Sequence, residues 1–556
     1  MERFINPYTF VPTEKGEKRN ISEYYEHEDR LLSGKIHCTM KTRTQITICD
    51  KVSEQQFDFF NVDGKPVIPG SSIRGVIRGV YETLTNSCFS STNAEDDDYF
   101  STRLNKSECG LLCFRNGEFI LYRAKRYKDK NNSQLGIYSE GEKVSFDSYE
   151  GNGKKKIFYL EKVNDSTSPK TGYVHKVNRF HGATTNLDSI FEQIDFKGTK
   201  IDKKYIDRFQ VNLSMSQKTS GTYQKLFEKM IKGNAMLPVW YCRLNGHYYF
   251  ASSQMSRSVF SKKPIDILKE HNLQKCTDMK NVCDACALFG MVSGNDACIS
   301  SRLRFSDAQC MTANPLEPES VTVILGSPRL SSFEFYLRCN ARSFTVDQDG
   351  VNIAGRKYYW HNNSGKPLRS VADSNDNNNM KHQIRLMKKD SMFGFDVFFD
   401  NITEEQLKKL VFALNLGEND LTSDHCHKIG HGKPLGLGSV KIICDKITVR
   451  RFEYPRYIEE DYSHILNEDN AGSFADQQNV KYILRVTDFN AVNGKDISYP
   501  YTFKGKKEIF KWFAGNRDGM RFIGKPIIYK QKLPGLMETY QKLDCESPKV
   551  DKQNNR

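Results

Sequence analysis

Residues 392–417 predict a strand followed directly by a helix; they read MFGFDVFFDNITEEQLKKLVFALNLG. Apolar residues at alternate positions share one face of the strand: Phe393, Phe395, Val397 and Phe399. Thr403–Gln406, TEEQ, has the capping-box pattern that begins a helix. Leucine and valine residues then recur at helical spacing, and Gly417 can end the helix. The stretch therefore predicts one βα unit.

A second strand and helix stand near the start of the chain. Gly34–Ile48, GKIHCTMKTRTQITI, begins with alternating apolar residues and predicts a half-buried strand. Val67–Leu84, VIPGSSIRGVIRGVYETL, predicts a helix that Ser71 or Ser72 can cap. One stripe of this helix is apolar and predicts its buried side: Ile73, Val76, Ile77, Val80 and Leu84.

Further strands are predicted at SRLRFSDA (residues 301–308) and SVKIICDKITV (residues 439–449). The order of core elements is then strand, helix, strand, strand, helix, strand. This order predicts an α+β fold with a ferredoxin-like (RRM-like) βαββαβ core, a large insertion after the first helix and a C-terminal extension. We expect four parts: the first part of the core (1–92), an inserted α+β subdomain (93–255), a zinc segment with the rest of the core (256–449), and the extension (450–556).

Composition indicates a partner that carries negative charge. The chain has 556 residues and a net charge of +14, with 82 Lys and Arg against 68 Asp and Glu. Such an excess favours a polyanion, because Lys and Arg dominate the binding of phosphate groups. No apolar run approaches the ~20 residues that span a bilayer, and the N-terminus lacks a signal-peptide pattern. We therefore expect a soluble, cytoplasmic protein with no membrane partner.

Two glycine-bearing segments are candidates for phosphate binding. Gly75 and Gly79 lie inside the first helix, where each costs roughly 0.5–1 kcal/mol relative to alanine. They let either a phosphodiester backbone or another protein segment approach closely, and Arg74 and Arg78 lie beside them. The second segment is Gly430–Gly438, GHGKPLGLG, which resembles a phosphate cradle without the Walker ending. A plain glycine-rich turn is the alternative.

A cluster of cysteines predicts a metal site. The 15 cysteines are an odd number, which disfavours a disulfide framework. The run HNLQKCTDMKNVCDAC contains the ligand types of a tetrahedral zinc site: His271, Cys276, Cys283 and Cys286. Cys298 is another candidate for the fourth ligand, and reduced loop cysteines are the alternative. Four protein ligands imply structural Zn²⁺, so no catalysis is assigned to it.

Two other groups have a functional and a structural interpretation. Asp424–His427, DHCH, is either a catalytic or metal site or a set of solvated loop residues. The aromatic residues of EIFKWFAG either stack on bases or pack in the core of the extension: Phe510, Trp512 and Phe513.

Four quoted segments together resemble a known family. They are IPGSSIRGVIR (residues 68–78), CDACALFG (283–290), SRLRFSDA (301–308) and HKIGHGKPLGLGSV (427–440). In this order they are similar to the signature of the repeat-associated mysterious protein (RAMP) superfamily of CRISPR systems. The greatest similarity is to the backbone subunits of type III effector complexes. The opening NPYTFVP and HEDRLLSGKI also resemble a large subgroup of these proteins.

The resemblance implies a subunit that binds guide RNA together with complementary target RNA and other CRISPR effector subunits. Carried over, the contacts to the guide backbone fall on seven residues: Ser71, Ser72, Arg74, Arg78, His431, Gly432 and Lys433. The family often has a zinc-binding segment just before its LFG. Many members cleave target RNA with one aspartate and a divalent cation such as Mg²⁺. Of Asp50, Asp58 and Asp63, the resemblance favours Asp58, and Asp63-Gly64 reads as a tight turn.

Three functions follow as hypotheses. The first is an RNA-guided nuclease subunit that uses Asp58. The second is a scaffold that binds guide RNA without catalysis. The third is a guide-processing endoribonuclease that uses His37 or His431 as a general acid or base and needs no metal.

Overall fold

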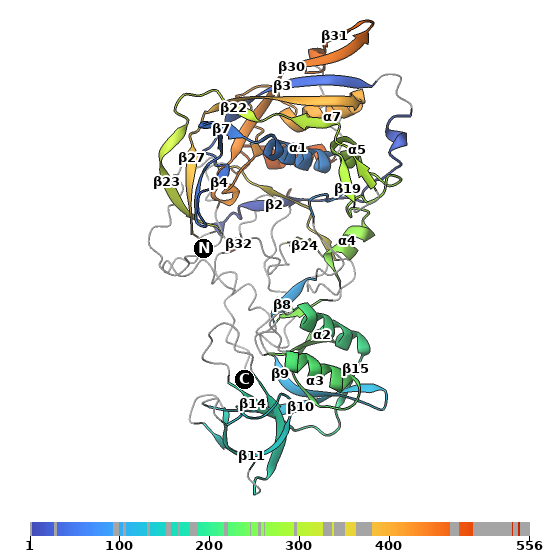
Figure 1. Cartoon of the computed structure of the whole chain (residues 1–556), viewed down its shortest axis with the longest axis vertical. Helices are drawn as coiled ribbons and strands as arrows, with labels where there is room; N and C mark the ends of the chain where they lie inside the picture. Colours follow the sequence, from blue (N-terminus) through green and yellow to red (C-terminus); the bar gives the residue numbers. More distant parts are fainter. Residues whose placement is uncertain are drawn as a thin grey trace.

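The computed structural model shows an upper and a lower lobe joined by a narrower middle region (Figure 1). It describes residues 3–26, 31–92, 99–103, 107–130, 134–151, 157–164, 167–176, 187–215, 221–244, 246–253, 257–260, 262–293, 297–325, 336–338, 351–362, 381–466, 478–492, 497, 536 and 543–544. Phe510, Trp512, Phe513 and the segment 27–30 of the HEDR motif lie outside the described residues. Within the described residues the fold is α+β, as the sequence predicts.

The main sheet of the upper lobe is built around β3 (Leu32–Thr42). β3 pairs antiparallel with β28 (Met392–Ile402) on one side and with β30 (Ser439–Glu453) on the other. The sheet order is β29-β30-β3-β28-β22-β7-β6, with β21 also on β28 and β31 on β30. The remaining strands of this sheet are β29 (His427–Lys428), β22 (Ala308–Cys310), β7 (Lys65–Ile68), β6 (Asn61–Val62), β21 (Leu303–Phe305) and β31 (Arg456–Asp461).

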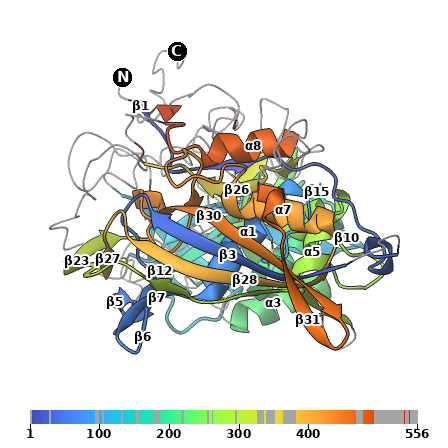
Figure 2. The same cartoon turned by 90° about the horizontal axis from the view of Figure 1, so that it is seen from above.

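Helices α1 (Gly70–Leu84) and α7 (Glu404–Asn415) cover one face of this sheet (Figures 1 and 2). The strands send alternate side chains to that face, so Ile36, Cys38 and Met40 of β3 are fully buried. The capping box of α7 is confirmed, because the Gln406 N–H donates to the Thr403 hydroxyl oxygen at 3.1 Å. The opposite face of the sheet carries polar residues, among them His37, which is paired with Asp396 at 2.8 Å.

A smaller sheet stands beside the main one. Its order is β23-β27-β5-β4, and β5 runs parallel to β27. The bounds are β23 (Leu316–Ile324), β27 (Lys381–Met387), β5 (Gln56–Phe59) and β4 (Cys49–Lys51). The polar residues of Asp50–Lys65, among them Asp50, Asp58 and Asp63, predict a loop between the first strand and the first helix. The structure differs, because β4 and β5 place part of this connection in strands of the small sheet.

The lower lobe is built from residues within the predicted insertion. Its sheet has the order β12-β11-β13-β14-β10-β9-β16-β17, with β15 on β10, and α2 and α3 pack against it. The dipeptide Asn116-Gly117 predicts a hairpin turn, and the structure confirms it, since both residues have positive φ and connect β9 to β10. The bounds are β9 (Glu108–Arg115), β10 (Glu118–Lys128), β11 (Lys143–Glu150), β12 (Phe158–Val163), β13 (Lys170–His175), β14 (Ser189–Gln193), β15 (Thr199–Ile201), α2 (Lys203–Met215), α3 (Gly221–Ile231), β16 (Leu237–Leu244) and β17 (His247–Ala251).

Short elements complete the described part of the chain. They are β1 (Arg3–Phe4), β2 (Tyr8–Val11), β8 (Ser101–Arg103), β18 (Arg257–Val259), α4 (Pro264–Glu270), α5 (Asp284–Phe289), β19 (Met291–Ser293), β20 (Ala297–Ile299), β24 (Leu337–Arg338), β25 (Asn352–Ile353), β26 (Arg356–Tyr359), α8 (Gln478–Thr487) and β32 (Leu543–Asp544). None of the helices that the structure describes is long and apolar enough to cross a membrane.

The close approach of β3 to β30 gives a test of the sheet. A Cβ at Gly34 would lie 2.0 Å from the Thr448 carbonyl oxygen, so Gly34→Ala forces the two strands apart. We expect a loss of about 1–3 kcal/mol in the free energy of unfolding, which is usual for overpacking. The measurement is the midpoint of urea unfolding. Gly394→Ala is the matched control, because its Cβ would meet only Met311 Sδ at an ordinary 3.6 Å; equal effects of the two variants would contradict the register of β3 with β30.

Candidate functional site

One side of α1 is open next to its two interior glycines. A Cβ built on Gly75 or on Gly79 would meet no atom within 4 Å, and Gly75 is exposed. Tyr358 reaches only the carbonyl oxygen of Gly79, at 3.3 Å. Among the described residues, no protein segment therefore needs these glycines for close packing. Glycine destabilises a helix relative to alanine, and no contact within the described chain explains why glycine stands at these two positions. We therefore favour the close approach of an external ligand as the explanation.

The two arginines beside the glycines are turned toward α5. Arg74 donates to the Phe289 carbonyl oxygen at 2.5 Å, and Arg78 donates to the Gly290 carbonyl oxygen at 3.1 Å. These carbonyls end α5, so both cations cap the C-terminus of that helix. The sequence predicts RNA contacts for Arg74 and Arg78 and gives no sign of this second task. Their RNA contacts remain a prediction, since a guanidinium has five N–H donors.

The start of α1 is partly occupied. The Gly70 N–H donates to Asp307 Oδ1 at 2.8 Å, which satisfies one of the free donors of the helix N-terminus. Ser71 is exposed and Ser72 is half-buried, and neither side chain caps the helix. Both hydroxyl groups therefore stay available, as a role in backbone contacts requires.

The glycine-rich loop between β29 and β30 lies against the segment that follows β3. The His431 N–H donates to the Thr47 carbonyl oxygen, and the Gly438 N–H donates to that of Gln45, both at 3.0 Å. Gly430 has a φ of +79°, and a Cβ there would lie 2.3 Å from the Thr47 oxygen. The glycine is thus required for conformation and for close approach, so this loop has a fixed shape.

The loop gathers positive groups. Burial is the main cause that lowers the pKa of Lys433. Burial, then His382 and then Lys433 lower the pKa of His431. Burial and the neighbouring Lys433 lower the pKa of Lys428 to about 7. No carboxylate contributes to these shifts, and the Lys428 ammonium donates to the carbonyl oxygens of Gly436 and Leu437.

Asp58 lies in β5, on the small sheet next to this loop. Its Oδ1 accepts the N–H of Phe59 at 2.7 Å, and its Oδ2 lies 3.9 Å from Arg385. The half-exposed carboxylate faces solvent as well. Asp50 stands opposite Asp58 in the register of β4 with β5, and Asp63 lies in the predicted turn, with a φ of 51°.

A row of rings joins the Asp58 strand to the glycine loop. The Phe57 ring lies 5.5 Å from the His382 ring, which lies 6.1 Å from the His431 ring. His382 is in β27, and its buried Nδ1 has no hydrogen-bond partner. Asp58 follows Phe57 in β5, so its carboxylate lies on the opposite face of the strand, toward Arg385, and the ring row does not bring it to His431. Sequence reasoning missed His382, because nothing in KHQIRLM marks that residue.

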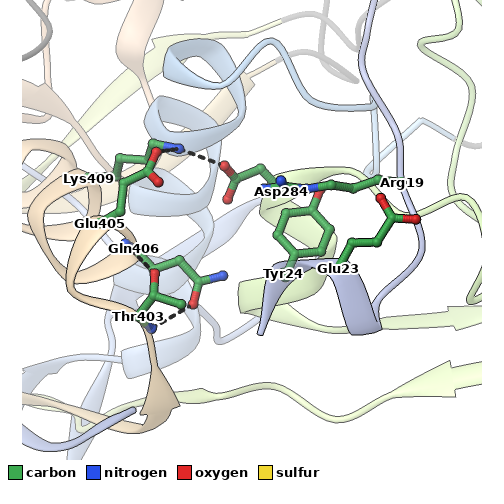
Figure 3. Close-up of a pocket in the computed structure, with 8 residues that line it drawn as sticks. All are labelled: Arg19, Glu23, Tyr24, Asp284, Thr403, Glu405, Gln406 and Lys409. Carbon is green, nitrogen blue, oxygen red and sulfur yellow. Dashed lines mark hydrogen bonds and ion pairs between the residues drawn. The ribbon is translucent and has the colours of Figure 1, made fainter. Parts of the chain in front are cut away.

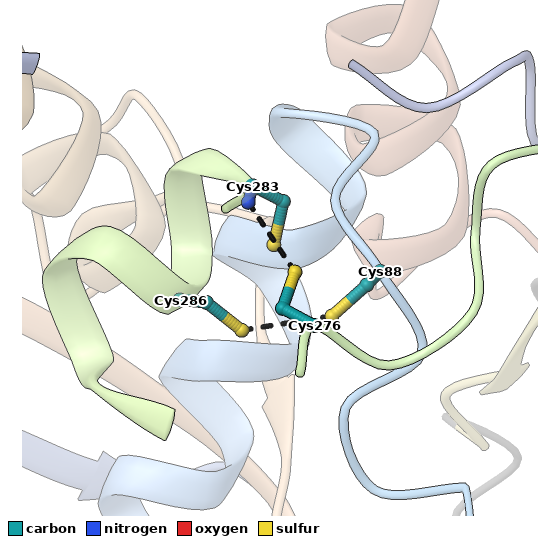
Figure 4. A group of neighbouring side chains, drawn as sticks. All are labelled: Cys88, Cys276, Cys283 and Cys286. Atoms are coloured by element: carbon teal, nitrogen blue, oxygen red, sulfur yellow. Dashed lines mark hydrogen bonds between the residues drawn. The ribbon is translucent and has the colours of Figure 1, made fainter. Parts of the chain in front are cut away.

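Four buried cysteines form the candidate metal centre (Figure 4). Cys88, Cys276, Cys283 and Cys286 have their sulfur atoms within 4.8 Å of one another. Cys88 Sγ lies 3.6 Å from Cys286 Sγ, close to the ~3.8 Å between sulfurs of a tetrahedral zinc site with Zn–S bonds of about 2.3 Å. The donor set therefore fits structural Zn²⁺, and the described cysteines are free thiols.

The fourth ligand differs from the sequence prediction. His271 ends α4, where its carbonyl oxygen accepts the Gly16 N–H, and its side chain is not in the cluster. Cys298 is exposed in β20. Cys88 takes this place because the chain after α1 turns back toward α5, a tertiary contact that local spacing cannot reveal. The cluster that is compatible with structural Zn²⁺ is therefore Cys88, Cys276, Cys283 and Cys286.

A polar pocket lies beside the metal segment (Figure 3). It is lined by Arg19, Glu23, Tyr24, Asp284, Thr403, Glu405, Gln406 and Lys409. Lys409 bridges Asp284 at 2.8 Å and Glu405 at 2.7 Å, and the Arg19 guanidinium lies over the Tyr24 ring at 3.8 Å. Because these charges satisfy one another, we interpret the pocket as a joint between the N-terminal segment, α5 and α7.

The DHCH run packs against the protein instead of gathering a metal site. His427 is buried, its Nε2 lies 2.8 Å from the Leu414 carbonyl oxygen, and burial lowers its pKa to about 4. His425 Nδ1 lies 3.2 Å from the Thr487 hydroxyl. Both histidines therefore have structural partners, where the sequence suggested either a site or a solvated loop.

The corrected ligand set gives a direct test. Cys88→Ser should strongly reduce the zinc that copurifies with the protein, because it removes one of four sulfur ligands. His271→Ala should leave zinc unchanged. Metal content measured by mass spectrometry on matched preparations checks both expectations. Zinc lost from His271→Ala and retained in Cys88→Ser would restore the original ligand set.

Comparisons with solved structures give weak overall likenesses. A type IV-B CRISPR complex matches with 10% identity and a TM-score of 0.23, covering 76% of this chain and 94% of that chain. A type III-B Cmr-beta complex bound to cognate target RNA matches with 9% identity and a TM-score of 0.19, covering 74% and 98%. Csc2 of Thermofilum pendens matches with 14% identity and a TM-score of 0.15, covering 41% and 53%.

The family comparison supports the resemblance that the sequence motifs indicate. No curated protein matches the sequence. The RAMP superfamily model matches residues 39–213, a range that includes the end of β3, the Asp58 strand, α1 and a large part of the lower lobe. The match contains the IPGSSIRGVIR segment on which the sequence resemblance depends. Over residues 39–213 the sequence therefore matches the RAMP superfamily, the family that its motifs resemble.

Proposed function

We propose that this protein is an RNA-binding subunit of a CRISPR effector complex and holds the backbone of a guide RNA. The observation that carries the proposal is the fixed shape of the glycine loop, which holds Lys428 and Lys433 without a carboxylate partner among the described residues. Such a group is costly until an anion arrives, and RNA supplies one phosphate for each nucleotide.

The fold supports the same proposal. The strands β30, β3, β28 and β21/β22 lie in the order fourth, first, third, second along the chain, and α1 and α7 connect them. We take this unit as the ferredoxin-like core that the family implies. The open glycine side of α1 then offers a second stretch where a ribose-phosphate strand can approach closely.

Cleavage of target RNA by Asp58 is the finer part of the proposal. Its carboxylate is half-exposed and lies on the strand that the ring row joins to the glycine loop. Among the described residues, acidic side chains do not gather around Asp58 into a metal-binding group, so nothing in the structure supports Mg²⁺ there. The non-catalytic scaffold thus stays the competing function.

The guide-processing hypothesis has less support. His37 lies on the polar face of the sheet and is paired with Asp396 at 2.8 Å. His431 packs near His382 at the glycine loop. Among the described residues no hydrogen bond or ring contact joins the two histidines, so they do not form one acid–base pair.

Alanine at the open glycines separates stability from RNA binding. Gly75→Ala should raise the free energy of unfolding by roughly 0.5–1 kcal/mol, because the helix gains propensity and the new Cβ meets no protein atom. The same methyl group should weaken binding of a guide RNA by about tenfold, equal to about 1.4 kcal/mol, if the backbone lies against this side. Urea unfolding and filter binding measure the two effects.

The matched control for this test is Gly221→Ala. Gly221 begins α3 in the lower lobe, and a Cβ there also meets nothing within 4 Å. We expect its RNA affinity to equal that of the wild type. Unchanged RNA affinity in Gly75→Ala would remove α1 from the binding surface.

Asp58→Asn tests catalysis. In the assembled complex this variant should bind guide-complementary RNA normally and leave it uncut, because the amide cannot hold a cation or orient the 2′-hydroxyl as a carboxylate does. Asp63→Asn is the control, since asparagine tolerates the positive φ of that turn. Gel analysis of labelled target with and without EDTA gives the readout. Equal cutting by Asp58→Asn and the wild type would assign cleavage elsewhere, and uncut target in all samples would favour the scaffold.

A further inference from the structure

Arg78 makes a contact that RNA binding does not explain. Its Nη2 donates to Cys286 Sγ at 3.3 Å, so the guanidinium touches a ligand of the candidate metal centre. The side chain is only 16% exposed, and its Nη1 is bonded to the Gly290 oxygen. Most donors of this cation are therefore directed into the protein.

A buried carboxylate fixes the orientation of Arg78. Glu82 accepts from Arg78 Nε at 2.9 Å through Oε1 and from Arg356 Nη1 at 2.9 Å through Oε2. Arg356 in turn donates to the Cys88 carbonyl oxygen at 3.1 Å. The chain of contacts runs from Cys286 through Arg78, Glu82 and Arg356 back to Cys88, and so connects two of the four sulfur-bearing residues.

Charge gives the reason for this arrangement. Four thiolates around one Zn²⁺ carry a net charge of about −2, and the site is buried. A cationic N–H donor on one sulfur offsets part of that charge and holds the ligand in place, as partners of metal ligands commonly do.

The same contacts join the metal centre to the RNA-facing helix. Beyond Arg74 and Arg78, Tyr81 donates to Asp284 Oδ1 at 2.8 Å, and the Ala285 N–H donates to the Ser87 hydroxyl oxygen at 3.0 Å. α5 has only six residues and is too short to be stable alone. We infer that α5 keeps its position through the metal and through this seam with α1.

We propose that Arg78 is an outer-sphere partner of the metal-bound Cys286 thiolate and couples zinc occupancy to the affinity of α1 for RNA. The coupling rests on the proposed function, whereas the role of Arg78 toward the metal does not. Loss of zinc would release α5, turn Arg74 and Arg78 away from its carbonyls and disturb the open side at Gly75 and Gly79.

The test compares Arg78→Gln with Arg74→Gln in the full chain. Arg74 donates to the Phe289 oxygen, whereas the hydrogen bond to Cys286 Sγ comes from Arg78, so Arg74 is the matched control. Arg78→Gln should weaken zinc binding by about 10–100-fold, the usual effect of removing an outer-sphere partner. Arg74→Gln should stay near the wild type. Competition with a chromogenic zinc chelator measures both.

RNA binding is then measured with and without added ZnCl₂. The weakened RNA affinity of Arg78→Gln should return when zinc is in excess. Unchanged zinc affinity in Arg78→Gln overturns the proposal. Weak RNA binding that zinc does not restore would instead make Arg78 a direct RNA contact, which also overturns the coupling but leaves the proposed function standing.

If the wild type binds zinc but no RNA, both the proposed function and the coupling of zinc occupancy to RNA affinity are wrong. The chelator assay would still decide whether Arg78 supports zinc binding. If Arg78→Gln does not fold, as judged by circular dichroism, Arg78→Lys replaces it. Lysine keeps the charge but cannot reach Cys286, Gly290 and Glu82 at once. We therefore expect the zinc affinity of Arg78→Lys to lie between those of the wild type and Arg78→Gln. If Arg78→Lys is the one variant that can be measured and it binds zinc as tightly as the wild type, the proposal is overturned.

Discussion

The seam between α1 and α5 is the contact on which the rest of the upper lobe depends. It joins the helix that follows the first part of the core to a short helix that stands about two hundred residues later in the chain. Apolar packing contributes through Tyr81 and Phe289, whose rings lie 5.5 Å apart in an edge arrangement. Polar contacts contribute through the arginines, Asp284 and the cysteine cluster. Because a helix of six residues is not stable alone, α5 depends on its contacts with α1, and a metal bound by the cysteines would add to them.

Much of the fold could be predicted from the sequence, and the reason is that its signals are local. The capping box before α7, the alternation in β3 and β28 and the Asn116-Gly117 turn each depend on a few neighbouring residues. The family motifs are local as well. The polar connection after β3 was the exception, since its short strands are stabilised by pairing with β27, which lies far along the chain.

The candidate site was only partly predictable, because its essential contacts are tertiary. Three of the four cysteines lie in one segment and were found, whereas Cys88 reaches them only after the chain folds back. Spacing of three and four residues placed Arg74 and Arg78 on one side of α1, but it could not show that α5 carbonyls would meet them. His382 carries no motif, and only the pairing of β27 with β5 places it between Phe57 and His431.

Charge is distributed differently in the two parts of the site. Around α5 each buried cation has a carboxylate, a carbonyl or a thiol within hydrogen-bond distance, as Arg78 and Lys409 show. At the glycine loop, Lys428 donates to the carbonyl oxygens of Gly436 and Leu437. Burial alone lowers the pKa of Lys433. A buried cation with an anionic partner in the protein can stabilise the fold. A buried cation without such a partner is costly in the free protein and gains stability when an anionic ligand binds. Helix α1 has three different surfaces. Its apolar stripe packs on the sheet, its arginines contact α5, and its glycines face outward. A strand of RNA against those glycines would therefore contact a helix whose position the metal centre already fixes.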